Sequence, residues 1–367
     1  MHQVWQENIS NGQSCHSRLS LPAGDSGLMG CGSPATPPAT ARPGTASGPA
    51  GHDARQARPA RPAAWAALLV VWVVWGSTFV AIRVGVESIP PLAMASVRYL
   101  VAGALLYPVA RSTGGARLRA ADRPGITQWL GMAVVGTLLL AFGNGAASYA
   151  EQTLPAGFTA LLIATVPIWM VLADRVINGR AIPRTGWLAL VIGVGGVAIL
   201  ARPHGRDSVL PILVVLGGSL SWGAGSVLAG RLPSPSRLLL GAAMEMLTGG
   251  AVLAGLASAT GEFSHLDLGL VSGRSWLALL YLTGPGSLLA MTCYMAALRR
   301  LPTAAVSTYA YVNPVVAVAL GALLLGERLT LVTLLGGAVV LLCVALLLAS
   351  RPAEASHDAA RAESAPG

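Results

Sequence analysis

The sequence repeats itself with a constant offset of 147 residues. Rare residue types coincide under this shift, and the coinciding pairs are Trp75-Gly76 with Trp222-Gly223, Trp129 with Trp276, Leu154-Pro155 with Leu301-Pro302, Pro167 with Pro314, and Gly179 with Gly326. The offset holds over more than a hundred residues, so neither half has a net insertion relative to the other. The chain is therefore an internal duplication, and the two halves are expected to fold alike.

The duplicated material is strongly apolar. Hydrophobic residues make up 54% of the chain and charged residues only 11%, against roughly 25% charged residues in a soluble domain. Apolar stretches of about 20 residues, long enough to cross a hydrocarbon core of about 30 Å, recur along the chain. We count ten of them: residues 65–83, 91–110, 128–148, 156–174, 185–201, 208–229, 238–258, 274–294, 303–323 and 331–349. Because backbone polar groups in lipid need partners within their own segment, these stretches predict membrane helices rather than a soluble helical core.

Five spans per half is an odd number, so the second half is expected to enter the membrane from the opposite side. The predicted fold class is an all-α integral membrane protein with ten transmembrane helices, arranged as two inverted five-helix repeats. The expected boundaries are residues 63–203 for the first repeat and 204–350 for the second. Secondary transporters use such repeats around a shared site near the bilayer midplane. Channels and assembly proteins can also be duplicated, so the repeat favours a transporter without proving one.

The two ends of the chain are made of different material. Residues 1–62 are rich in Pro, Ala, Gly and Ser, and residues 351–367 are short and polar, so both tails are predicted to be disordered. The chain has no lysine, and its orientation rests on arginine. With the N-terminus inside, eleven arginines lie in cytoplasmic loops, against four and the helix-end Arg83 on the other side. The positive-inside rule then places both termini in the cytoplasm, and the net charge of +9 needs no nucleic-acid partner.

Two charged residues lie in the middle of predicted spans. Arg98 in span 2 and Glu245 in span 7 are 147 residues apart, so they hold equivalent positions in the two halves. Such charges are costly in a membrane and usually line the protein interior or a water-filled cavity. One interpretation is that both face a central cavity as substrate or coupling groups, with Arg98 near the carboxylate and Glu245 near the amine of a zwitterion such as an amino acid. The alternative is structural: each pairs with neighbours, or Arg98 reaches the lipid headgroups.

Glu151 ends span 3, just before the Leu154-Pro155 turn. A partly desolvated carboxylate there could exchange protons near neutral pH. Glu151 and Glu245 are therefore the candidates for coupling substrate movement to protons. The alternative is that Glu151 is a helix-end acid in contact with water.

Pro167 and Pro314 fall inside the fourth span of each half, at matching positions. A proline removes one backbone hydrogen bond and clashes with the preceding turn, so it breaks or kinks a helix. Matching helix breaks in both halves point to the site of a transporter, although a kink without function is the alternative. Tyr309, Tyr311 and Asn313 place aromatic and amide groups beside the second break.

The remaining cavity candidates are Asn144, near the end of span 3, and the repeated Trp75 and Trp222. Tryptophan in membrane helices is often interfacial, but Trp75 lies about ten residues into its span, so lining a cavity and packing are both open. No glycine-rich phosphate loop, metalloprotease motif or catalytic triad is recognisable, and the four cysteines make no metal or redox pattern. We therefore expect neither an enzyme nor a metal or cofactor site.

Several passages resemble the EamA family of the drug/metabolite transporter superfamily over residues 65–350. The most specific are Trp75-Gly76-Ser77-Thr78-Phe79, Tyr309-Ala310-Tyr311-Val312-Asn313-Pro314 and Gly326-Glu327-Arg328-Leu329. Residues 85–91 and Ala164-Thr165-Val166-Pro167 are closest to its YedA-like branch of inner-membrane exporters. The resemblance implies export of amino acids, related metabolites or drugs by alternating access. One departure is that Gly326-Glu327 in the second half corresponds to Gly179-Arg180 in the first.

The sequence thus predicts a secondary transporter of the inner membrane, with a small-molecule substrate, surrounding lipid and protons as a candidate coupling ion. A membrane interaction or regulatory protein that kept the fold without moving solute is the second interpretation, and a passive channel is the third. The oligomeric state is open.

Overall fold

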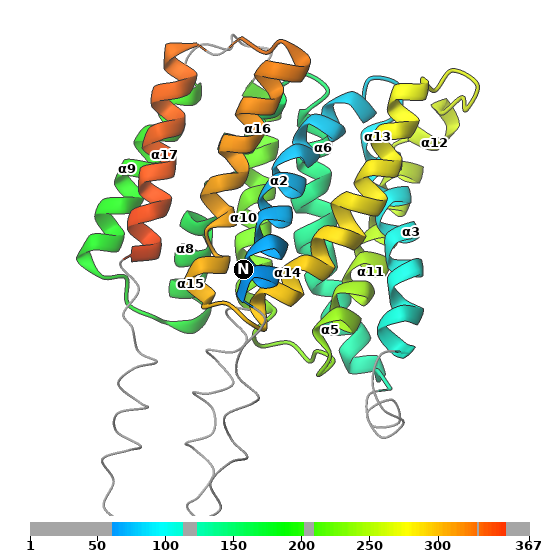
Figure 1. Ribbon diagram of the computed structural model, residues 1–367, viewed down its shortest axis with the longest axis horizontal. Coiled ribbons are helices and arrows are strands. Elements are labelled where there is room, and N and C mark those ends of the chain that lie inside the picture. Colours follow the sequence, from blue (N-terminus) through cyan, green and yellow to red (C-terminus); the bar gives the residue numbers. More distant parts are fainter. Residues whose placement is uncertain (1–60, 113–122, 202–208, 329, 350–367) are drawn as a thin grey trace, which may run out of the picture.

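The computed structural model describes residues 61–112, 123–201, 209–328 and 330–349, and all regular secondary structure in these ranges is helical (Figure 1). The tails expected to be disordered, residues 1–62 and 351–367, lie outside the described residues apart from Arg61 and Pro62, with which the first helix begins. The predicted spans can therefore be compared with helices one by one.

Each half of the chain folds into a similar series of helices. In the first half these are α2 (Arg61–Gly85), α3 (Pro91–Ser112), α5 (Ile126–Gly136), the π-helical segment η2 (Thr137–Asn144), α6 (Gly145–Ala150), α7 (Ala156–Ile163), α8 (Val166–Asn178) and α9 (Arg184–Ala201). In the second half they are α10 (Val209–Leu228), α11 (Leu238–Ala259), the short α12 (Glu262–His265), α13 (Gly273–Thr283), the π-helical segment η4 (Gly284–Leu289), α14 (Ala290–Leu298), α15 (Thr303–Val306), α16 (Tyr309–Leu325) and α17 (Leu331–Ala349).

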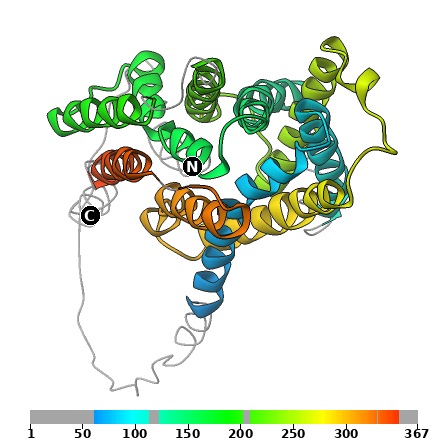
Figure 2. The same ribbon diagram turned by 90° about the horizontal axis from the view of Figure 1, so that it is seen from above.

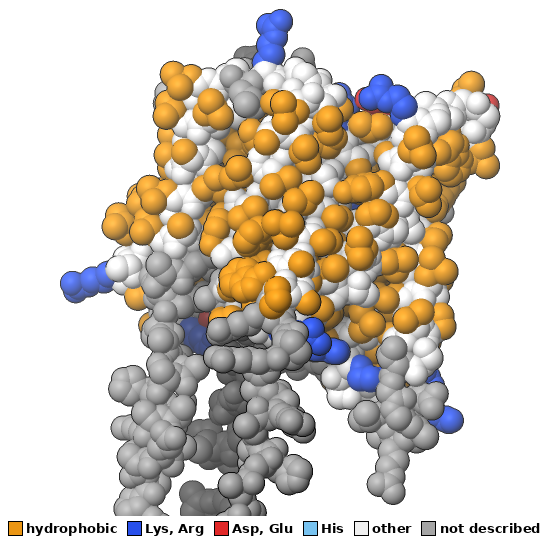
Figure 3. Space-filling model, viewed as in Figure 1, with side chains coloured by type: hydrophobic (Ala, Val, Ile, Leu, Met, Phe, Trp, Pro, Cys, Tyr) orange, Lys and Arg blue, Asp and Glu red, His pale blue; other side chains and the backbone are white. Residues whose placement is uncertain are grey.

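Seven of the predicted spans correspond to helical stretches long and apolar enough to cross a membrane. The other three correspond to shorter apolar helices, Arg184–Leu200, Tyr309–Leu325 and Leu331–Leu347. Hydrophobic side chains cover the middle of the face shown in Figure 3, and arginines lie near its upper and lower margins. This distribution is that of a helical membrane protein.

The fourth span of each half is broken, but not at equivalent positions. In the first half α7 ends at Ile163 and α8 starts at Val166, so Pro167 occupies the first turn of α8, where its missing N–H costs nothing. In the second half the break comes earlier, between α15 and α16, and Pro314 lies inside α16. The prediction of a helix break at Pro314 is therefore wrong. The helix continues through this proline, which cannot donate a hydrogen bond to the carbonyl of Ala310.

The third span of each half contains a π-helical segment that was not predicted. η2 begins at Thr137 and η4 at Gly284, positions related by the offset of 147 residues. A π-helical turn adds a residue to the helical repeat and redirects the side chains that follow, and such turns are frequent at functional sites. In the second half, the sequence Gly284-Pro285-Gly286 could have indicated an irregular helix at this position.

Helix packing follows the duplication. The equivalent helices α3 and α11 pack against each other, as do α9 and α17, which lie together at one edge of the molecule (Figure 2). α2 packs against α16 and α14, and its counterpart α10 packs against α8 and against η2 and α6 of the third span. Helices of the two halves therefore interleave instead of forming two separate bundles.

The repeated Trp-Gly pairs mark close helix crossings. A Cβ added at Gly76 in α2 would lie 2.6 Å from the Cβ of Val316 in α16. A Cβ added at Gly223 in α10 would lie 2.8 Å from the backbone nitrogen of Met170 in α8. Apolar side chains gain little from leaving lipid, so helices associate there through close packing at small residues. The glycine of each pair is thus required by the approach of a neighbouring helix.

Two acidic residues of the second half cap helices of the first. Glu262 accepts a hydrogen bond from the N–H of Ala93 in α3 at 2.8 Å. Glu327 accepts hydrogen bonds from the N–H groups of Ala156 at 2.6 Å and Gly157 at 3.1 Å, at the start of α7. The first N–H groups of a helix have no partner within it, and negative charge is favoured at this end. Both contacts therefore hold the two halves together.

The glycine contact between α5 and α11 gives a stability test. A Cβ at Gly249 would lie 2.6 Å from the carbonyl oxygen of Gly136, so Gly249→Ala should force the two backbones apart. Overpacking of this kind typically costs about 1–3 kcal/mol. Gly255→Ala on the same helix is the matched control, because a Cβ there meets nothing within 4 Å. Unfolding of the purified variants in detergent measures both, and equal stability of the two would contradict the packing account.

Candidate functional site

A cavity of about 240 Å³ is lined by residues from both halves of the chain. Eight of the ten residues singled out in the sequence line it: Trp75, Arg98, Asn144, Pro167, Trp222, Glu245, Asn313 and Pro314. Tyr311 and Glu151 are not among the lining residues. The rest of the wall is mainly apolar, so the few polar side chains decide what the cavity can bind.

Arg98 is the basic group of the cavity. Its side chain is 6% exposed, and its Nε donates a hydrogen bond to the Oγ of Ser287 at 3.0 Å. The guanidinium carbon also lies 4.8 Å from the centre of the Tyr99 ring, within the range of a cation–π contact. Arg98 is therefore held in place at the cavity wall by its neighbours and does not extend to the headgroups.

Ser287 is positioned by the π-helical segment η4. Its Oγ donates to the carbonyl oxygen of Leu282, five residues earlier, at 2.9 Å. That hydroxyl can at the same time accept from Arg98, because a hydroxyl has one donor and two acceptor positions. Arg98 belongs to the first half of the chain, and its hydrogen-bond partner Ser287 belongs to the second. Sequence reasoning missed Ser287, because serine is common in membrane helices and only the π-helical register directs it to Arg98.

Glu245 is the acidic group of the cavity. It lies on α11 and is partly buried, next to the cavity-lining Ala242 and Met246. The backbone of α11 is fixed here by the close approach of α5, since a Cβ at Gly136 would lie 2.5 Å from the carbonyl oxygen of Glu245. The equivalent residues Arg98 and Glu245 therefore bring opposite charges to one cavity from two helices that pack together.

Three aromatic rings form a cluster at the cavity wall. The ring of Trp75 lies 5.2 Å from the ring of Tyr294 and 5.2 Å from that of Tyr309, and the two tyrosine rings are 5.7 Å apart. These centroid distances are those of favourable edge-to-face or tilted contacts. Trp72, three residues before Trp75, donates to the Oγ1 of Thr308 at 3.1 Å and so ties α2 to the break before α16.

Trp75 of this cluster was a cavity candidate in the sequence, Tyr309 was noted there beside the expected second helix break, and Tyr294 was not singled out. The offset of 147 residues relates Trp75 to Trp222, but it relates Tyr294 to Ala147 and Tyr309 to Leu162. The aromatic cluster thus joins Trp75 of the first half to Tyr294 and Tyr309 of the second, and the offset generates no equivalent cluster from Trp222. Contacts between residues more than 200 positions apart leave no local signal in a single sequence.

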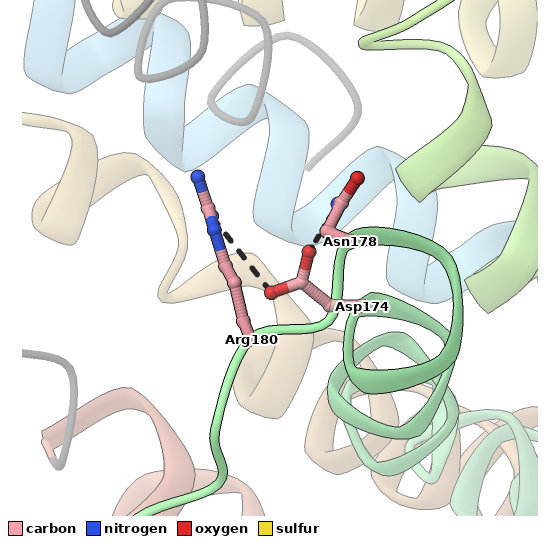
Figure 4. A network of polar contacts seen from close by, with 3 residues as sticks. All are labelled: Asp174, Asn178 and Arg180. Atoms are coloured by element: carbon pink, nitrogen blue, oxygen red, sulfur yellow. Dashed lines mark hydrogen bonds and ion pairs between the residues drawn. The ribbon is translucent and has the colours of Figure 1, made fainter.

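The first half has Gly179-Arg180 where the second half has Gly326-Glu327, and the two pairs make different contacts. The Nη1 of Arg180 lies 3.8 Å from the Oδ2 of Asp174, and the Oδ1 of Asp174 accepts a hydrogen bond from Asn178 (Figure 4). Asp174 corresponds to Gly321 in the second half. There the carboxylate of Glu327 comes so close that a Cβ at Gly321 would lie 2.4 Å from its Oε2. The first half thus places a local ion pair where the second half places a carboxylate that reaches α7.

Residues 63–202 and 209–349 each match the EamA-like transporter family. The chain belongs to this family. The two matches cover most of the chain and separate the same halves as the offset of 147 residues does. EamA proteins are transporters and not enzymes, so the chain is a helical membrane transporter.

Relatives of this EamA protein carry matching names. It is 39% identical over 275 residues to the inner membrane transporter YedA of Escherichia coli (strain K12), covering 74% of this chain and 86% of that protein. It is 26% identical over 282 residues to a Salmonella typhimurium (strain LT2) protein named "Probable amino-acid metabolite efflux pump", covering 72% and 88%. It is also 28% identical over 272 residues to the transporter YdfC of Bacillus subtilis (strain 168), covering 72% and 83%.

Proposed function

We propose that this EamA protein is a secondary transporter that exports small zwitterionic metabolites, amino acids or related compounds, across the inner membrane by alternating access. The observation that carries the proposal is the single cavity that places Arg98 and Glu245 in one mainly apolar wall. A carboxylate and an amine on one small molecule would complement these two side chains. The name of the Salmonella relative, an amino-acid metabolite efflux pump, supports this substrate class.

The size of the cavity supports a small substrate. Pockets for drug-sized ligands usually have about 300–1,000 Å³, and this cavity has about 240 Å³. The volume favours a compound of amino-acid size over a larger drug in this conformation. Asn144 and Asn313, which also line the cavity, would add amide donors and acceptors to bind the polar groups of such a compound.

For the membrane architecture we propose ten spans in two inverted repeats, residues 63–203 and 204–350. The packing of α3 with α11 and of α9 with α17 supports this arrangement, because equivalent helices meet where a two-fold axis relates two halves. Alternating access then consists of an exchange of conformations between the halves. The cluster of Trp75, Tyr294 and Tyr309 would close the cavity on one side in the conformation described here.

A passive channel is the second candidate function, since the cavity alone does not distinguish a transporter from a pore. The aromatic cluster favours a transporter, because a channel needs a continuous polar path and these packed rings lie in the cavity wall. Saturable exchange of labelled solute would support transport, and flux that rises linearly with concentration would support a channel.

We further propose that both termini lie in the cytoplasm, on the basis of the arginine distribution. A reporter protein that becomes fluorescent only in the cytoplasm should be active when fused after Gly367. A periplasmic phosphatase fused at the same position should be inactive. The reverse pair of results would invert the proposed topology.

The two charged residues of the cavity give the direct test of the substrate site. Vesicles containing the protein are loaded with a mixed pool of amino acids and related metabolites, and exchange with labelled amino acids is measured. Loss of one charge-assisted hydrogen bond costs about 1.5–3 kcal/mol, so Arg98→Gln or Glu245→Gln should weaken apparent substrate binding roughly ten- to a hundredfold.

Two matched controls carry the same substitutions outside the cavity: Arg111→Gln, at the end of α3, and Glu87→Gln, exposed after α2. Both controls should exchange amino acids like the wild type. Wild-type exchange by Arg98→Gln and Glu245→Gln, at equal amounts of inserted protein, would contradict the proposed site.

A further inference from the structure

Glu151 is the most completely shielded carboxylate among the described residues. Its side chain is 0% exposed, and neither of its carboxylate oxygens has a hydrogen-bond partner in the described part of the chain. An ionised carboxylate without partners is strongly disfavoured away from water, whereas a carboxyl group that has bound a proton carries no charge. The sequence alternative of a helix-end acid in contact with water is therefore not what the structure describes.

The two arginines near Glu151 make their described hydrogen bonds to groups other than its side-chain carboxylate. The charged side chains whose fields reach Glu151 are Arg83, Arg98 and Glu327. Arg83 donates to the backbone carbonyls of Glu151 at 2.9 Å and Gln152 at 3.3 Å, so it caps the end of the third span. Arg98 donates to Ser287.

Glu327 and Glu151 lie on either side of the same turn but in opposite environments. The carboxylate of Glu327 accepts two N–H groups at the start of α7, an arrangement that stabilises the ionised form. The two acids thus differ in their surroundings: Glu327 accepts two backbone hydrogen bonds, whereas the carboxylate oxygens of Glu151 accept none in the described part of the chain.

This cluster of Arg83, Glu151 and Glu327 adjoins the cavity. Ile82, next to Arg83, lines the cavity, and so does Ala147, one helical turn before Glu151. Along α2, Arg83 lies eight residues or about 12 Å beyond Trp75, so the charged cluster and the aromatic cluster lie at different levels of the cavity.

The charged cluster exists only once in the duplicated chain. The offset of 147 residues relates Arg83 to Gly230, Glu151 to Leu298 and Glu327 to Arg180. A group that binds a proton on one side of the membrane is needed at one end alone.

We propose that Glu151 is the proton-binding site of this transporter. Its carboxylate takes up one proton from water to become a neutral carboxyl group when this end closes around it. The same proton returns to water when the end opens and the contacts of Glu327 with α7 separate. This proposal rests on the proposed transport function and makes Glu151, and not Glu245, the group that couples substrate movement to protons.

The protonation state can be measured without knowing the substrate. Infrared difference spectra of the full-length protein in lipid at neutral pH should contain the C=O band of a neutral carboxylic acid, and Glu151→Gln should remove it. Glu327→Gln, which removes the neighbouring acid, and Glu87→Gln, which removes an exposed one, should both retain the band. Loss of the band in Glu327→Gln, or its persistence in Glu151→Gln, would overturn the proposal.

Coupling is tested in vesicles with labelled amino acids. An imposed pH gradient should change the rate of wild-type uptake several-fold. In Glu151→Gln, whose side chain imitates the neutral acid, exchange without a gradient should persist while the effect of the gradient disappears. A wild-type response to the gradient in Glu151→Gln would overturn the coupling role. Absence of any exchange by the wild type would contradict the transport function instead, and the infrared result would still decide where the proton is bound.

Discussion

The close approach of helix backbones at glycine is the interaction on which the rest of this structure depends. In lipid the burial of apolar side chains does little to bring helices together, so packing at small residues has to do so. Gly76 and Gly223 let α2 and α10 cross their partners, and Gly136 and Gly249 bring the third span against α11.

A duplicated chain starts with two equivalent halves, which can then diverge. Here the close glycine crossing is kept in both halves at Gly76 and Gly223, while polar and aromatic residues have diverged. Arg98 and Glu245 place opposite charges at one pair of equivalent positions. The aromatic cluster around Trp75 and the charged cluster around Glu151 each occur in only one copy. The proposed substrate and proton would then meet different chemistry on the two sides of the cavity.

The sequence predicted seven helices that are long and apolar enough to cross a membrane, because long apolar runs are a property of the chain itself. It also identified the charged and amide residues of the cavity, because Arg98, Glu245 and the asparagines are costly to place in lipid. It misplaced the second helix break, since Pro314 is accommodated within α16 while the break precedes Tyr309. It did not predict the contact of Ser287 with Arg98 or of Glu327 with α7, because these depend on a π-helical register and on packing between distant segments.

Alternating access between equivalent halves is the central claim, and distances between spin labels test it most directly. One pair of labels is placed at the exposed Gln152 and Arg328, beside the charged cluster, and a second pair at the exposed Ala181 and Arg299, which the offset of 147 residues relates to the first. Electron–electron resonance in lipid is then compared with and without a saturating pool of amino acids. The account predicts that one distance lengthens while the other shortens. Two distances that stay unchanged, or that change in the same direction, would contradict it.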